Sequence, residues 1–386
     1  MMSRIVRIVL PALALIFAAA CGSSGGGEPT TGITGPGGPL VMGLSRQYSV
    51  DFPGVSAGSV TWYLTDPEAG TITSTGLFTA GAKAGTFAIV ATAIADADIT
   101  DTLQVTVIPY ALGTPLGMAA YGVAVSSTGL IAAADNNATV RIRNGATTSS
   151  VITGSTPVHL AFSPDGGQLF VTSMGFKLFR ITVANGAIVD TADFGRAVYN
   201  IAIRPTDSLV YVSTSDGWIY KVAPATLEVV DSVELASASN GLAFGPGGTV
   251  LWASTIDAGV LYKLDPATLA KTDSMVLGLG LQRLAVAPSG DSVYVGNQNT
   301  NEIFIVRAST GDISSVSLAG SPHGVGITSD GTRLFVATLS GTVSVYSRST
   351  MTFLGSLPLP GSGRTVAAGA GNVMFVSTEN NVVRID

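Results

Sequence analysis

The most regular feature of the chain is a hydrophobic pattern that repeats along its C-terminal two thirds. Seven times, two apolar residues flank a small one, and the starts of these triplets lie 37, 41, 41, 42, 41 and 41 residues apart. Alternating apolar and polar runs surround each triplet, and this period of two is typical of short β-strands. The triplets occupy residues 123–125, 160–162, 201–203, 242–244, 284–286, 325–327 and 366–368. In five copies an aromatic residue lies ten positions after the start: Phe170, Tyr211, Trp252, Tyr294 and Phe335.

Repeats of about 40–45 residues with four short strands each are typical of a β-propeller. In that fold every repeat is a sheet with two apolar faces that neighbouring sheets cover, and ring closure leaves few exposed edges. We therefore predict an all-β protein in which residues 110–386 form a seven-bladed β-propeller. The chain stops in the third strand of the last repeat, at residues 382–386, so residues 110–116 are expected to supply its fourth strand.

Residues 40–109 show shorter alternating runs, the strongest at 47–52, 59–64, 86–95 and 102–108. With about seventy residues and no helical period, antiparallel strands bury their inner faces best as a small β-sandwich, which the resemblance given below makes Ig-like. We expect Trp62 to lie in the core of this sandwich. A Trp62 that stacks on a sugar ring at the surface is the alternative.

The N-terminus has the order of an export signal. Arg4 and Arg7 precede an apolar run at residues 8–17, which three alanines follow, so residues 1–20 are predicted to be a secretory signal peptide. Cys21, the only cysteine, comes next, and residues 21–39 are rich in glycine and proline without apolar periodicity. This composition predicts a flexible tether.

Composition narrows the possible partners. Of 386 residues only 11% are charged, the formal net charge is −6, and 47 are glycine. A single cysteine excludes a disulfide scaffold and a thiolate metal site. Because no cluster of lysine and arginine is present, nucleic acid is not an expected partner.

Residues just before the innermost strands are expected to surround the mouth of the central channel. They are Tyr121, His159, Asn200, Asn240, Arg283, His323 and Arg364. Arginine forks suit carboxylates and phosphates, so this ring favours a pocket for an anionic or hydroxyl-rich small ligand. The alternative is that strand ends near solvent carry polar residues in any propeller. Polar loops on the same face, such as residues 379–381, are interpreted as turns first.

The sequence predicts no catalytic residues, no metal site and no cofactor. The two histidines fall in different repeats, so we expect them across the ring from each other, without the local partners that a zinc site needs. No Ser-His-Asp order stands out, and Cys21 is assigned to the N-terminal region.

Three segments resemble known families. The sequence Ala-Ala-Ala-Cys at 18–21 resembles a bacterial lipoprotein lipobox, which implies lipidation of Cys21, although Ala18 stands where that family usually has leucine. An ordinary signal-peptidase site before an incidental Cys21 is the alternative. Val-Thr-Trp at 60–62 and Ser-Thr-Gly-Leu-Phe-Thr at 74–79 resemble bacterial Ig-like domains of group 2. Ser-Pro-Asp-Gly at 163–166 with Leu-Phe-Val-Thr at 169–172, and Val-Tyr-Val-Gly-Asn at 293–297, resemble YVTN-type, YncE-like or lactonase-like propellers.

Together these features predict a lipid-anchored protein of the bacterial cell envelope, at the outer membrane or cell surface. Its propeller face would bind or scaffold an unknown protein, a glycan or a small anionic ligand without chemistry of its own. A lactonase-like hydrolase or lyase with its site at the channel mouth is one alternative. A surface adhesin is the other.

Overall fold

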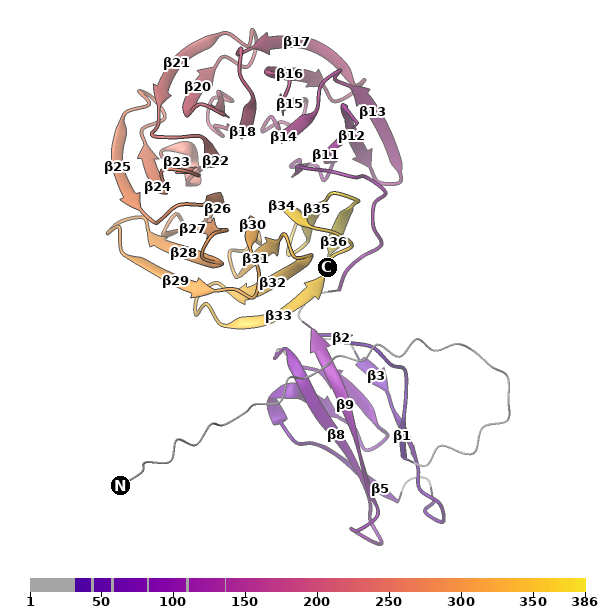
Figure 1. Ribbon diagram of the computed structural model, residues 1–386. Helices are drawn as coiled ribbons and strands as arrows, with labels where there is room; N and C mark the ends of the chain where they lie inside the picture. Colours follow the sequence, from indigo (N-terminus) through magenta and orange to yellow (C-terminus); the bar gives the residue numbers. More distant parts are fainter. Residues whose placement is uncertain (1–31, 43–44, 57–58, 82, 109–110, 136) are drawn as a thin grey trace, which may run out of the picture.

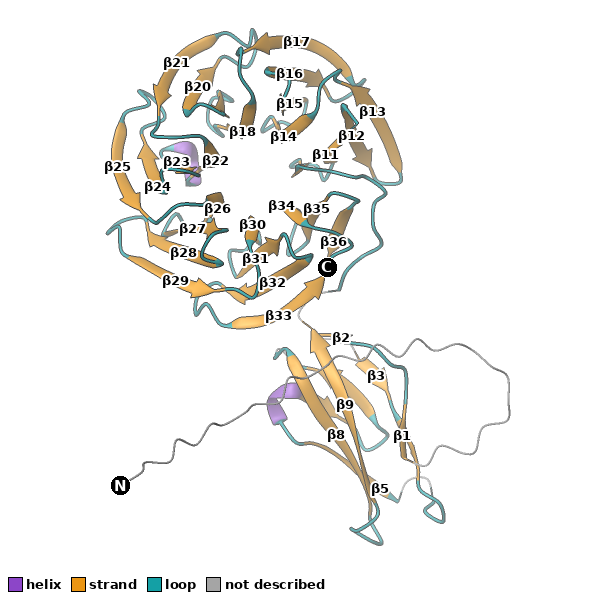
Figure 2. Cartoon of the chain, viewed as in Figure 1, coloured by secondary structure: helices purple, strands orange, loops and turns teal. Residues whose placement is uncertain are grey.

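The computed structural model describes residues 32–386 except 43–44, 57–58, 82, 109–110 and 136. The predicted signal peptide, Cys21 and the first part of the predicted tether therefore lie outside the described residues. Among the described residues nearly all regular structure is β-strand (Figure 2), together with two short 3-10 helices at Pro67–Ala69 and Pro246–Gly248. No helix in the described part of the chain is long and apolar enough to span a membrane.

The N-terminal module packs three small sheets around one core. Their strand orders are β2-β9-β8-β5, β3-β7-β6 and β1-β4. Phe78 and Ile89 are fully buried in the core, and Trp62, expected in the core, is partly buried and packs against it. The strands are β1 (Gly32–Thr34), β2 (Leu40–Val41), β3 (Ser45–Gln47), β4 (Ser49–Asp51), β5 (Val60–Leu64), β6 (Gly70–Ile72), β7 (Leu77–Ala80), β8 (Gly85–Ala93) and β9 (Thr100–Ile108).

The sequence predicts a tether that extends to residue 39, but residue 32 already belongs to the folded N-terminal module. Strand β1 lies inside the predicted tether and pairs with β4, and the Ile33 side chain is only 9% exposed. The Ile33 N–H donates a hydrogen bond of 2.6 Å to the carboxylate of Asp101. A single apolar residue among glycines and prolines has no periodicity, which is why the sequence pattern did not reveal this strand.

From residue 123 onward the strands form successive antiparallel sheets arranged in a circle (Figure 1). The described residues form six four-stranded sheets and one three-stranded sheet there, each built from consecutive strands. The inner strands are β10 (Val123–Val125), β14 (Pro157–Phe162), β18 (Val198–Ile203), β22 (Ser239–Phe244), β26 (Leu281–Val286), β30 (Pro322–Ile327) and β34 (Gly363–Ala368). The second strands are β11 (Ile131–Asp135), β15 (Gln168–Ser173), β19 (Val210–Thr214), β23 (Leu251–Thr255), β27 (Ser292–Asn297), β31 (Arg333–Thr338) and β35 (Met374–Thr378).

The third and fourth strands complete the sheets toward the outside of the circle. The third strands are β12 (Thr139–Asn144), β16 (Lys177–Thr182), β20 (Trp218–Val222), β24 (Val260–Leu264), β28 (Glu302–Arg307), β32 (Thr342–Ser347) and β36 (Val382–Ile385). The fourth strands are β13 (Thr147–Ile152), β17 (Ala187–Asp193), β21 (Val229–Glu234), β25 (Lys271–Val276), β29 (Ile313–Ser317) and β33 (Phe353–Pro358).

The repeated aromatic residues join each sheet to the next. Phe170, Tyr211, Trp252, Tyr294 and Phe335 are at most 2% exposed. Each lies directly across the strand pair from the small residue of its triplet, as Ala161 faces Phe170 and Gly326 faces Phe335. The aromatic ring then packs into a cluster with the following sheet: Phe335, for example, packs with residues of β34 to β36. The small residue leaves room for the ring, which explains the repeated triplet.

A segment that lies just before the first sheet of the circle closes the circle. Residues 111–116 run antiparallel to β36, where the sequence predicts the closing strand. The N–H of Gly113 donates to the carbonyl of Arg384 at 2.7 Å, and the N–H of Leu116 donates to that of Val382 at 2.9 Å. Leu112 forms a bridge with Ile385 and packs in the last core cluster. The closing segment and β36 thus depend on each other although about 270 residues of sequence separate them.

Replacing Gly113 with proline should lower the free energy of unfolding by about 1–3 kcal/mol, because proline has no N–H to donate to Arg384. The control is Gly113→Ala, which keeps the N–H; its Cβ would lie 3.3 Å from the carbonyl oxygen of Arg384 and should cost much less. Thermal and urea melts of both variants measure the difference. Equal stability of the two variants would contradict the closing role of this segment.

Candidate functional site

The residues expected at the channel mouth lie within a distortion of the inner strands. In six inner strands the register shifts at this level, as between Pro157 and Leu160, where two residues oppose one on the neighbouring strand. Such a β-bulge inserts one residue and re-aims the side chains beside it. The sequence places these residues just before the inner strands. The structure corrects this for all except Tyr121, because the bulge extends the strands past them.

Arg283 is the centre of the ring. Its side chain is 7% exposed and lies between His159 and His323, which come from β14 and β30. One terminal nitrogen, Nη1, contacts Nδ1 of His323 at 2.7 Å and donates to the carbonyl of Arg364 at 2.5 Å. The other, Nη2, contacts Nε2 of His159. The two histidines therefore meet at one guanidinium, closer together than their positions in different repeats suggested.

These contacts determine the protonation state and the tautomer of both imidazoles. A guanidinium has only donors, so Nδ1 of His323 and Nε2 of His159 must both accept and carry no proton. His323 is then the Nε2–H tautomer, and its Nδ1, 2.9 Å from the carbonyl of Arg364, makes no hydrogen bond there. His159, 5% exposed, is the Nδ1–H tautomer.

The titration of these groups follows from burial beside a cation. Burial, then the charge of Arg283, lowers the pKa of His323 to about 3. Burial and the same cation hold the pKa of His159 well below its usual range. Burial, with Arg364 acting in the same direction, lowers the pKa of Arg283 to about 9, so it stays cationic at neutral pH. The centre of the ring is thus one positive charge between two neutral histidines.

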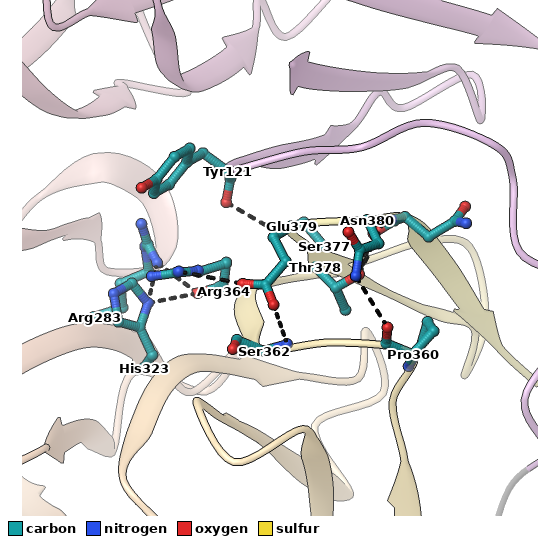
Figure 3. A network of polar contacts seen from close by, with 11 residues as sticks. Tyr121, Arg283, His323, Pro360, Ser362, Arg364, Ser377, Thr378, Glu379 and Asn380 are labelled. Carbon is teal, nitrogen blue, oxygen red and sulfur yellow. Dashed lines mark hydrogen bonds and ion pairs between the residues drawn. The ribbon is translucent and has the colours of Figure 1, made fainter. Parts of the chain in front are cut away.

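Arg364 is the second cation of the ring (Figure 3). Its guanidinium lies 5.1 Å from the centre of the Tyr121 ring, a cation–π contact. Its Nη2 lies 3.4 Å from the carboxylate of Glu379, and that carboxylate also accepts from the N–H of Ser362 at 3.4 Å. In the described residues, Glu379 is the carboxylate paired with this ring. Glu379 lies in a loop that the sequence assigns to turn formation.

The opposite side of the ring is an amide chain. Asn200 donates to the carbonyl of Asn240 at 2.6 Å, and Asn240 contacts the side chain of Gln282. Gln282 is buried and was missed by the sequence analysis, although it immediately precedes Arg283. The seven predicted ring residues thus form two groups, and the members of each group contact one another. One group contains the two arginines, the histidines and Tyr121, and the other contains the amides.

Two cavities meet at Arg283. The outer one has a volume of about 310 Å³, and Tyr121, Met174, Tyr199, Ile256, Arg283 and His323 are among its lining residues. The inner one, about 140 Å³, is lined by Arg283 and by one apolar side chain from each inner strand. These apolar residues are Val123, Leu160, Ile201, Leu242, Leu284, Val325 and Val366.

The arrangement favours binding an anion over catalysis. Both histidines are held as acceptors by Arg283 and are not free to serve as bases for a nucleophile. The described residues contain no group of three or more His, Cys, Asp or Glu side chains that could hold a metal ion. Nε of Arg283 is buried without a hydrogen-bond partner.

Comparison with solved structures shows the fold. A chain of the "Crystal Structure of Mitotic Checkpoint Complex" matches with a TM-score of 0.65 and 14% identity, over 72% of this chain and 91% of its own length. The beta-propeller domain of Cps50 (Swd1) from Myceliophteria thermophila matches with a TM-score of 0.63 and 16% identity, over 72% and 99%. The circle of sheets is a β-propeller. No protein-family model matches the chain, and no curated protein matches its sequence. At these identities the likeness shows the fold of the propeller alone.

The neutral histidines predict acid sensitivity. A pKa lowered from 6.5 to about 3 means that unfolded His323 binds a proton below about pH 6.5 while the folded side chain does not. The free energy of unfolding should therefore fall as pH falls through this window, with each buried histidine adding at most about 1.4 kcal/mol per pH unit to the slope.

Urea unfolding of the wild type and of His323→Gln between pH 4.5 and 7 tests this. Glutamine keeps an oxygen that accepts from Arg283, and the variant should show the shallower slope. Identical slopes would overturn the assignment of His323 as neutral.

Proposed function

We propose that this chain is an exported, lipid-anchored binding protein of the bacterial cell envelope, at the outer membrane or cell surface. In this proposal a signal peptide and Cys21 precede a tether, a bacterial Ig-like module acts as a spacer, and a seven-bladed YVTN-type propeller binds the ligand at its channel mouth. The protein performs no chemistry there. The observation that carries the binding role is the buried cation of Arg283, which has no carboxylate partner in the described structure.

A buried charge without a counter-ion is costly to the fold. Removing a cation from water costs several kcal/mol even after the protein relaxes, and in most proteins a paired carboxylate offsets that cost. Arg283 has only neutral acceptors and a second cation nearby. A group that weakens the fold at the centre of a hollow face is typical of a binding site.

The proposed binding site is also compatible with partners other than a small anion. A protein or a glycan on the same face is compatible with the ring of amides and aromatic side chains. A lactonase-like hydrolase is disfavoured by the two histidines, since both are already hydrogen-bond acceptors of Arg283.

A thermal-shift screen should find a ligand that raises the melting temperature of the wild type. The panel contains carboxylates, phosphates, neutral oligosaccharides and amines. Thr156 lines the outer cavity, so Thr156→Trp should fill it and abolish the shift whatever the ligand class. Thr350→Trp, in an exposed turn between β32 and β33, is the control and should respond as the wild type does.

Two outcomes would contradict the proposed role. A panel that leaves the wild-type melt unchanged rejects binding at the channel mouth. Turnover of lactone or ester substrates that is lost in His159→Ala or His323→Ala makes the protein an enzyme.

The membrane anchor has its own test. In a bacterial host, wild-type protein should incorporate a labelled fatty acid and fractionate with membranes, because acyl chains gain about 0.8 kcal/mol per buried methylene. Cys21→Ser should abolish the label and release the protein into the soluble fraction. Unchanged labelling or unchanged membrane association in Cys21→Ser would show that Cys21 is not the anchor.

A further inference from the structure

The outer cavity is lined by one cationic side chain, Arg283, and by several apolar side chains. Arg283 and His323 lie among its polar residues, whereas Tyr121, Tyr199, Met174 and Ile256 supply aromatic and aliphatic surface. Its volume of about 310 Å³ is at the small end of cavities that hold small organic molecules, roughly 300–1,000 Å³. Apolar walls with one charged anchor favour a ligand that has both an apolar body and an opposite charge.

The guanidinium of Arg283 still has donors to offer. It carries five N–H groups, of which Nη1 uses two, on His323 and Arg364, and Nη2 uses one, on His159. Nε is buried without a partner, so Nε–H and one Nη2–H remain. Nε and Nη2 are the nitrogens with which arginine forms a side-on fork to a carboxylate.

The charges around the cavity favour an anion. Arg283 and Arg364 are cationic, both histidines are neutral, and Glu379 is the carboxylate in contact with the ring. The ring therefore carries an excess of one positive charge within a chain whose formal net charge is −6. A bound anion would neutralise the cation that the fold leaves uncompensated.

We propose that the channel mouth binds a small organic carboxylate with an apolar body. The carboxylate pairs with the guanidinium of Arg283, which lines the cavity, and the body packs against Tyr121, Tyr199, Met174 and Ile256. This inference rests on the proposed binding function and names the ligand class for the same site. Under this inference a purely inorganic anion leaves the apolar walls uncovered and a neutral glycan leaves the cation unpaired, so both should bind more weakly than the carboxylate.

Isothermal titration calorimetry with three probes tests the ligand class. The probes are 3-phenylpropanoate, the matched neutral alcohol 3-phenylpropan-1-ol, and inorganic phosphate. We expect the carboxylate to bind at least about tenfold more tightly than either of the others, since a charge-assisted bidentate contact to a buried guanidinium is lost with the alcohol. Equal affinity for acid and alcohol would overturn the role of Arg283. Equal affinity for acid and phosphate would overturn the role of the apolar walls.

Two kinds of variant locate the site. Arg283→Gln should weaken the carboxylate by about tenfold or more and leave the alcohol unchanged. Met174, which is exposed at the rim of the cavity, gives a pair that does not disturb the core. Met174→Glu should weaken the carboxylate by about threefold relative to the isosteric Met174→Gln, and added salt should reduce the difference. No difference between the Met174 variants at low salt would place the carboxylate elsewhere.

The probes also separate this inference from the binding function itself. If the carboxylate does not bind while a neutral or cationic compound raises the melting temperature of the wild type but not of Thr156→Trp, the ligand class is wrong and the binding face stands. If neither the probes nor any compound of the panel binds, both proposals fail.

Discussion

The circle of sheets depends on a repeated cross-strand pair of one small and one aromatic residue. Ala161 faces Phe170 and Gly326 faces Phe335, and each aromatic ring fills the space toward the following sheet. At Gly326 a Cβ would lie 2.5 Å from Cγ1 of Val366 in the next inner strand, so a larger residue there would force the neighbouring atoms to shift. Because interiors are close-packed, this pair sets how near successive inner strands approach, and thereby the size of the channel.

The channel mouth takes its shape from a second feature of the same strands. A bulge in six inner strands extends them past the ring residues and turns their side chains toward the mouth. Residues that stand at different distances from their triplets, such as His159 and His323, thereby reach one guanidinium. The apolar side chains of the inner strands lie next to this polar ring, so Arg283 is buried although it lies near an opening of the fold.

This placement also decides the chemistry of the histidines. In water an imidazole accepts a proton near neutral pH, but here burial and the neighbouring cation keep both rings neutral. Their unprotonated nitrogens then stabilise Arg283 in place of a carboxylate. The result is a positive charge held in position by neutral groups, an arrangement suited to anion recognition and ill-suited to general acid–base catalysis.

The sequence by itself determined the all-β class, the repeated sheets and the positions of the aromatic wedges, because hydrophobic periodicity and the small–aromatic spacing are local patterns. It also predicted seven polar residues at the channel mouth, and the structure brings these into two groups joined by hydrogen bonds and a cation–π contact. It did not show strand β1, where one buried isoleucine carries no period, nor the bulges, which have no sequence signature. That His159, Arg283 and His323 touch, and that Gln282 contacts Asn240, was decided only when strands 40 or more residues apart in sequence were brought around one axis. These contacts join residues of different repeats, and their positions depend on how the sheets are arranged around the channel. The sequence of a single repeat does not specify that arrangement.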